Sequence, residues 1–152
     1  MLPKRKTLIV LSLIVLIGVG VVLYQLAART TFGNVLDETI PSQEDITHIT
    51  VEAYSEELGE TLWATIDDVE IIDHLLTEHK EIALKKQRTK HTKILDYTMT
   101  ISTPTKSDSF HFDETHFVAS GTDYKMLNGH LVDSIDRLDV EWQTTDEFLG
   151  IE

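Results

Sequence analysis

The chain contains no cysteine among its 152 residues. This absence excludes disulfide bonds, thiolate metal ligands, a cysteine nucleophile and lipid attachment to cysteine. The sequence also lacks Gly-x-Ser-x-Gly and Ser-x-x-Lys motifs, and it has no glycine-rich phosphate loop, because Gly18 and Gly20 fall within an apolar run. We therefore identify no catalytic residue and expect no cofactor.

Basic residues are scarce beyond residue 30. Residues 1–30 hold Lys4, Arg5, Lys6 and Arg29 and no acid, which leaves nine of the 13 basic residues beside all 26 acidic ones. An acidic domain of this kind repels the phosphates of nucleic acids. We therefore expect no nucleic-acid partner.

An uncharged apolar run occupies residues 8–28. At about 1.5 Å of rise per residue, a helix of this length spans roughly 30 Å, the thickness of the hydrocarbon core of a bilayer. The run therefore predicts a transmembrane signal anchor. Lys4, Arg5 and Lys6 precede it and only Arg29 follows closely, so the positive-inside rule places residues 1–7 in the cytoplasm as a stub. The remaining chain is expected to be extracytoplasmic, in a single-pass protein of the cell membrane.

A cleaved signal peptide is the alternative interpretation of this run. The apolar region of a signal peptide is about 7–15 residues long and ends at a small-x-small site. Here the region is longer, and the best candidate site, Leu26-Ala27-Ala28, has leucine where a small residue is required. The pattern favours an uncleaved anchor.

Beyond the anchor, the pattern predicts one folded domain between a tether and an acidic tail that is ordered in part. Residues 29–45 have no consistent period and are interpreted as a tether, and residues 140–152 as an acidic tail. Between them, residues 46–139 show alternation typical of half-buried strands at 49–53, 62–66, 97–101, 110–112, 117–119 and 124–126.

Two helices are expected within this domain. One begins at Asp67, with Glu70 completing a capping box and Val69, Ile72, Leu75 and Leu76 on its inner face. The other covers residues 131–138. Short connections between the strands favour antiparallel pairing, so the predicted fold class is α+β: a mainly antiparallel sheet with two helices on one face.

The layout resembles that of small membrane-anchored extracytoplasmic domains of uncharacterised function from Gram-positive bacteria. The resemblance covers residues 46–139 and includes the Asp-capped helix start Ile-Asp-Asp-Val-Glu-Ile-Ile at residues 66–72. It implies a location and a fold and assigns no active-site residue. This chain differs from the lipid-anchored members in having no cysteine.

Histidines supply the candidates for metal binding. His111 and Asp113 share a face of the expected strand, and a turn at Glu114 would bring His116 round to complete a set of zinc ligands. The alternative is that Phe110 and Phe112 fill the core while the polar residues face water. His74 and His79 lie about 140° apart around their helix and are interpreted as surface side chains.

The unusual feature of the acidic domain is a basic run within residues 85–93, expected to be an exposed connection. It contains five of the nine basic residues: Lys85, Lys86, Arg88, Lys90 and Lys93. Such a run docks on anionic wall polymer, lipid headgroups or an acidic partner; alternatively it offsets nearby acids and protects a strand edge.

These observations predict a non-catalytic, membrane-anchored module that binds a protein or cell-wall polymer. The alternative is a small cell-envelope hydrolase or metal-dependent enzyme that uses the region from His111 to His116.

Overall fold

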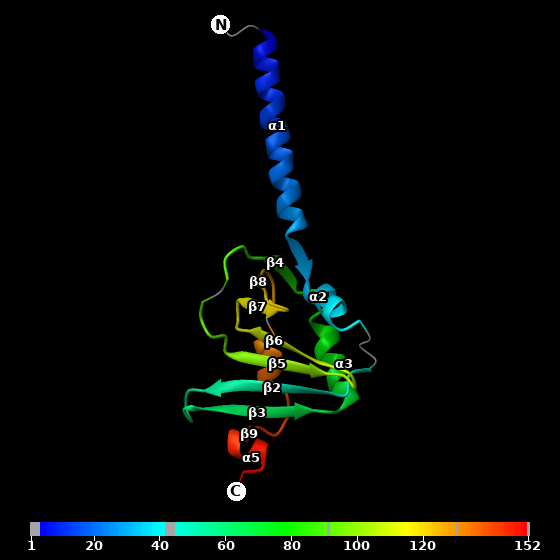
Figure 1. Cartoon of the computed structure of the whole chain (residues 1–152), viewed down its shortest axis with the longest axis vertical. Helices are drawn as coiled ribbons and strands as arrows, with labels where there is room; N and C mark the ends of the chain where they lie inside the picture. The colour runs from blue at the N-terminus through cyan, green and yellow to red at the C-terminus, as the bar shows by residue number, and fades with distance from the viewer. Residues whose placement is uncertain (1–3, 42–44, 91, 130, 152) are drawn as a thin grey trace.

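The computed structural model describes residues 4–41, 45–90, 92–129 and 131–151. Helix α1 (Lys4–Ala27) projects from one end of a domain that contains all the other elements (Figure 1). In the described part of the chain, α1 is the one helix long and apolar enough to cross a membrane, with a candidate span of Leu8–Ala27. A signal sequence meets the same criterion. The expected span therefore exists as a helix, and it ends one residue earlier than predicted.

The domain is built on a single antiparallel sheet. Among the described residues the sheet has nine strands in the order β1-β4-β8-β7-β6-β5-β2-β3-β9. Their bounds are Arg29–Thr31 (β1), His48–Ser55 (β2), Glu60–Ile66 (β3), Ala83–Lys86 (β4), Tyr97–Ser102 (β5), Ser107–Phe112 (β6), His116–Ala119 (β7), Thr122–Met126 (β8) and Gln143–Thr144 (β9). The strands are stacked away from α1, with β4 close to it and β9 at the far end (Figure 1).

Helices cover one face of this sheet. Their bounds are Phe32–Thr39 (α2), Val69–Glu78 (α3) and Val132–Asp136 (α4), and a further short helix, Thr145–Leu149 (α5), lies beside β9. Side chains of α2, α3 and α4 form one apolar cluster with the inner face of the sheet. Its largest fully buried members include Phe32, Phe110, Phe112, Phe117, Leu36, Ile49, Leu84, Met99 and Ile101. The structure thus confirms the predicted α+β class and antiparallel pairing, and α2 is an additional helix.

The prediction of a tether over residues 29–45 is wrong for its first part. Phe32 and Leu36 are almost fully buried, and Ile40 follows them into the core. The first turn of α2 is fixed by backbone hydrogen bonds, since Phe32 N donates to Ile82 O at 2.9 Å and Gly33 N donates to Lys80 O at 3.1 Å. A helix of eight residues gives too few repeats for its period to be visible in the sequence.

The acidic tail expected over residues 140–152 contains ordered structure, β9 and α5. Strand β9 pairs with β3, and the Trp63 and Phe148 rings stack with centroids 4.9 Å apart. Thr144 and Glu147 form a complete capping box at the start of α5. The C-terminal segment therefore covers the outer edge of the sheet, which is a common protection for an exposed strand.

Helix α3 begins one residue later than predicted. Its N-cap is Asp68, whose carboxylate accepts from Glu70 N at 2.8 Å and from Ile71 N at 3.3 Å. Val69, the first helical residue, is 73% exposed and not on the inner face as predicted, while Ile72, Leu75 and Leu76 face the core as expected. Asp67 and Asp68 are equivalent as caps in the sequence, so packing of the apolar face decides between them.

Candidate functional site

The first two residues of the basic run, Lys85 and Lys86, belong to a strand. The prediction that the whole run is an exposed connection is therefore wrong for these two residues. Residues 83–86 form β4, which pairs with β1 on one side and β8 on the other. Leu84 is the one completely buried residue of this strand. A single buried leucine among lysines gives no recognisable alternation, so the strand is not evident before its partners are known.

Two residues of the run contact the last turn of α1. The Arg88 Nε donates to the Tyr24 hydroxyl at 2.8 Å, and its guanidinium carbon lies 4.8 Å from the centre of the Tyr24 ring. The Lys85 ammonium donates to the Gln25 side-chain oxygen at 3.4 Å. Backbone pairing adds to these contacts, since Lys86 N donates to Ala28 O at 2.9 Å. The basic run is therefore joined to the end of the apolar helix.

Sheet pairing brings two further cations to this place. Arg29 lies directly opposite Lys85, which lies directly opposite Lys125 on β8. Because residues opposite each other on adjacent strands point to the same face, the three cations form a row on the uncovered face of the sheet. Arg29 and Lys125 are not predicted as site residues from the sequence, because they lie 96 positions apart and only the strand register brings them together.

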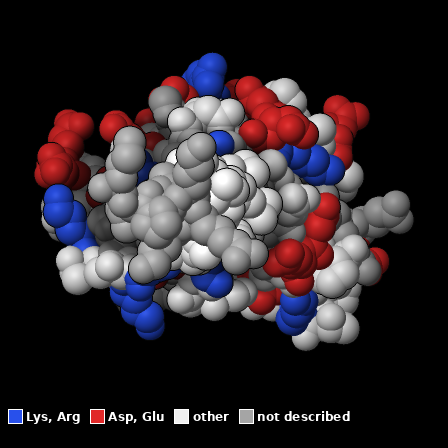
Figure 2. Space-filling model, turned by 90° about the horizontal axis from the view of Figure 1, so that it is seen from above, with Lys and Arg blue, Asp and Glu red and all other residues white. Residues whose placement is uncertain are grey.

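We call the set Arg29, Lys85, Arg88 and Lys125 the basic surface; the side chain of Lys86, the next residue along β4, points to the other face of the sheet. Of the ion pairs formed within residues 4–41, 45–90, 92–129 and 131–151, none involves a member of this set. Lys90 and Lys93, the remaining members of the predicted run, are exposed in the connection that leads to β5. Viewed along α1, Lys and Arg side chains appear on several sides of the helix, with acidic groups between them (Figure 2).

The predicted metal ligands do not form a set. His111 lies on the uncovered face, where its Nδ1 is 3.0 Å from Thr98 Oγ1. Asp113 instead closes the turn between β6 and β7, because its Oδ1 accepts from Thr115 N at 2.6 Å and His116 N at 2.7 Å. Burial raises the pKa of Asp113, but these hydrogen bonds outweigh it and lower the pKa below its usual range. In the described part of the chain, no three His, Asp or Glu side chains are placed to hold a metal ion.

His79 is buried, contrary to its interpretation as a surface side chain. It is 6% exposed, and its Nε2 lies 3.9 Å from Glu78 Oε2 without a hydrogen-bond partner among the described residues. It borders a cavity of about 320 Å³ that is also lined by Glu78, Ser134 and Arg137. Leu75 and Leu76 draw this end of α3 into the core, and the imidazole follows them.

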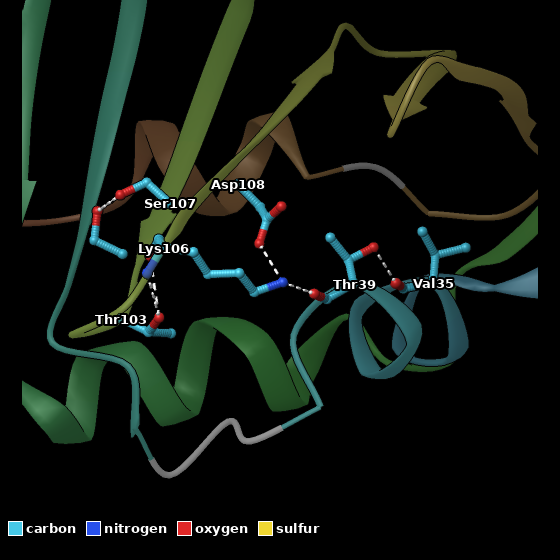
Figure 3. Close-up of polar contacts among 7 residues, drawn as sticks. Val35, Thr39, Thr103, Lys106, Ser107 and Asp108 are labelled. Atoms are coloured by element: carbon cyan, nitrogen blue, oxygen red, sulfur yellow. Dashed lines mark hydrogen bonds and ion pairs between the residues drawn. The ribbon is translucent and has the colours of Figure 1, made fainter.

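Lys106 holds the C-terminus of α2 against the hairpin between β5 and β6 (Figure 3). Its ammonium donates a hydrogen bond to Thr39 O. The ammonium also lies 2.8 Å from Asp108 Oδ2, where the two groups form an ion pair without the angles of a hydrogen bond. Thr103 Oγ1 donates to Lys106 O at 3.0 Å and fixes the turn. Lys106, one of the few basic residues outside the basic surface, therefore joins α2 to the sheet. Thr103 and Lys106 also line a second cavity, of about 430 Å³.

Comparisons of the chain with models of protein families, with curated proteins and with solved structures found no match.

Proposed function

We propose that this protein is a non-catalytic binding module, anchored in the cell membrane by α1 and carrying its folded domain outside the cytoplasm. Its partner is a protein or a cell-wall polymer at the outer surface. The direct junction between α1 and the sheet is the observation that carries this proposal. Ala28 is the single residue between α1 and β1, and its carbonyl accepts from Lys86 N.

This junction suits a binding module because it holds the domain at a fixed position beside the membrane. A flexible tether would let the domain sample many orientations, at an entropic cost when a partner binds. Here the backbone hydrogen bond and the contacts of Arg88 and Lys85 with α1 remove that freedom in advance.

The uncovered face of the sheet offers a surface for such a partner. Neighbouring strands β5 and β6 present polar side chains in register on this face, joined across the strands in the exposed pairs Thr98–His111 and Thr100–Ser109. Short hydroxyl side chains lose little conformational entropy when a partner binds and both donate and accept hydrogen bonds. A flat surface of this kind suits the hydroxyl-rich or amide-rich surface of a polymer or protein.

Topology is tested with the intact protein carrying an epitope after Glu152. Protease added to intact cells or protoplasts should remove the epitope and leave a short N-terminal fragment in the membrane. An epitope that is protected until the membrane is opened would contradict the proposal, and so would release of the whole domain without its anchor.

Binding is tested with a photo-crosslinking residue at Thr100, on the uncovered face, compared with one at Leu58, in the β2–β3 turn. Crosslinking in living cells should give a specific product at Thr100 that competes away when unlabelled protein is overproduced. Equal products at both positions would show random collision and would contradict use of the sheet face.

A further inference from the structure

Contacts with α1 determine the level of the basic surface relative to the proposed membrane. Tyr24 and Gln25 lie at the end of the candidate span Leu8–Ala27. Tyrosine near the end of a transmembrane helix sits at the level of the lipid headgroups, where its ring is in apolar surroundings and its hydroxyl is in water. Because Arg88 is bonded to the Tyr24 hydroxyl and Lys85 to Gln25, both cations lie at that level.

The strand register adds an electrostatic argument. Arg29, Lys85 and Lys125 lie directly opposite one another, an arrangement that disfavours folding because like charges on adjacent strands repel. The domain is rich in carboxylates, yet none forms an ion pair with this row within the described residues. Anions from outside the protein would relieve the repulsion.

We propose that the basic surface binds the headgroups of anionic phospholipids in the leaflet from which α1 emerges. The inference rests on the proposed membrane anchor and names a second, lipid partner for the domain. Phosphate groups of this leaflet lie at the level of Tyr24, and each Lys or Arg beside an anionic membrane surface favours binding by about fivefold. Arg88, through its planar guanidinium, suits bidentate binding of phosphate.

The turn between β2 and β3 carries Glu56 and Glu57, and α5 carries Asp146 and Glu147, all exposed. Both segments lie in the half of the domain away from α1 (Figure 1). Acidic side chains also lie among the Lys and Arg side chains at the α1 end (Figure 2), so attraction to an anionic leaflet is assigned to the basic surface alone.

The test uses the full-length chain in nanodiscs of phosphatidylcholine alone or of equal parts phosphatidylcholine and phosphatidylglycerol. Because the chain has no cysteine, Thr89→Cys and Glu57→Cys each provide a single labelling site, beside the basic surface and at the far end. Quenching of a fluorophore by a headgroup-attached quencher reports proximity to lipid. Phosphatidylglycerol should increase quenching at residue 89 and leave residue 57 unchanged. High salt should reverse the increase, since the Debye length falls from about 10 Å at 0.1 M to about 3 Å at 1 M.

A matched pair of charge variants tests the residues. Lys85→Gln with Arg88→Gln should reduce the response to phosphatidylglycerol by about an order of magnitude or more, at fivefold per residue. Lys80→Gln with Arg137→Gln removes the same charge outside the basic surface and should leave the response unchanged. Both double variants keep Arg29 and should melt within a few degrees of the wild type, as surface changes usually do.

Three results would overturn the inference: no response to phosphatidylglycerol in the wild type, equal loss in both double variants, or binding of soluble polyphosphate without any response to the lipid. The last result would assign the surface to a polymer. None of them affects the protease experiment, so the proposed anchored module would stand. Conversely, an epitope on the cytoplasmic side would refute the proposed function, whatever the nanodiscs show.

Discussion

The buried imidazole of His79 makes the stability of the domain depend on pH. Burial lowers the pKa of His79 below its ordinary value of 6.5; Glu78 opposes the change, and Arg137 and His74 reinforce it. Between the folded-state pKa and 6.5 the unfolded chain therefore binds more protons than the folded chain. The stability associated with His79 is fully present above pH 6.5 and is lost as the pH falls toward the folded-state pKa.

Urea denaturation on both sides of pH 6.5 tests this expectation. His79→Asn should flatten the dependence of the unfolding free energy on pH in this window, whatever its effect on stability at neutral pH. His111→Asn is the control, because His111 lies on the uncovered face of the sheet and is not among the groups that act on His79, so this variant should keep the wild-type profile. Identical profiles for His79→Asn and the wild type would show that another group titrates.

Phe32 gives a second prediction at the residue scale. Its ring is 1% exposed and meets the Phe117 ring edge-on, with centroids 5.4 Å apart. Phe32→Ala should lower the unfolding free energy by about 3–5 kcal/mol, the usual cost of deleting a buried aromatic ring. Val69→Ala, at an exposed site, should change it by about 0.5 kcal/mol or less. A tether at residues 29–45 would make both changes harmless.

At the scale of elements, sequence patterns were informative where a strand was long or a turn was marked. Strands β2, β3, β5 and β6 each have six or more residues and alternate clearly, so the sequence predicts them, and it also predicts the shorter β7 and β8. In the short connection between β7 and β8, Ser120 and Gly121 adopt the positive φ angles of a tight hairpin. Five short elements are not predicted: β1, α2, β4, β9 and α5. Each owes its structure to a distant partner, as β9 does to Trp63.

The same limit applies to the candidate site. The five basic residues between 85 and 93 are recognised from the sequence alone, because the charge of each residue type is known and the five lie close together in the chain. Their position beside α1 is not, because it depends on β1 pairing with β4. The candidate set His111, Asp113 and His116 shows the same limit: Asp113 accepts hydrogen bonds within the turn between β6 and β7, a local role that ligand spacing does not reveal.

The C-terminal cap of the sheet provides a prediction for an element. Phe148 stacks on Trp63, whose indole Nε1 donates to Thr145 Oγ1 at 3.1 Å. Phe148→Ala should destabilise the domain by about 1–2 kcal/mol, since it removes an aromatic pair and uncovers the edge of β3. Near-UV circular dichroism should weaken as Trp63 loses its fixed environment. Leu149→Ala, at an exposed neighbour, should have neither effect.

For the whole molecule, the structure redefines the minimal folding unit. The core cluster includes Phe32, Val35, Leu36 and Ile40, and the outer sheet edge needs β9 and α5. A fragment of residues 29–151 should therefore unfold cooperatively in urea, whereas the predicted domain of residues 46–139 should be unfolded or aggregate. Cooperative unfolding of the shorter fragment with similar stability would show that both flanking segments are dispensable.

The junction at Ala28 has a mechanical consequence for the whole protein. A transmembrane helix tilts when the bilayer becomes thinner than its apolar length. In the proposed membrane-anchored protein, one residue lies between α1 and β1, and Arg88 and Lys85 contact the end of α1, so a tilt of α1 would be passed to the sheet as a rotation. The domain would then turn about the point where α1 leaves the membrane. Bilayer thickness would determine the direction in which the uncovered sheet face looks, so the protein would translate a property of the lipid into the aim of its binding surface.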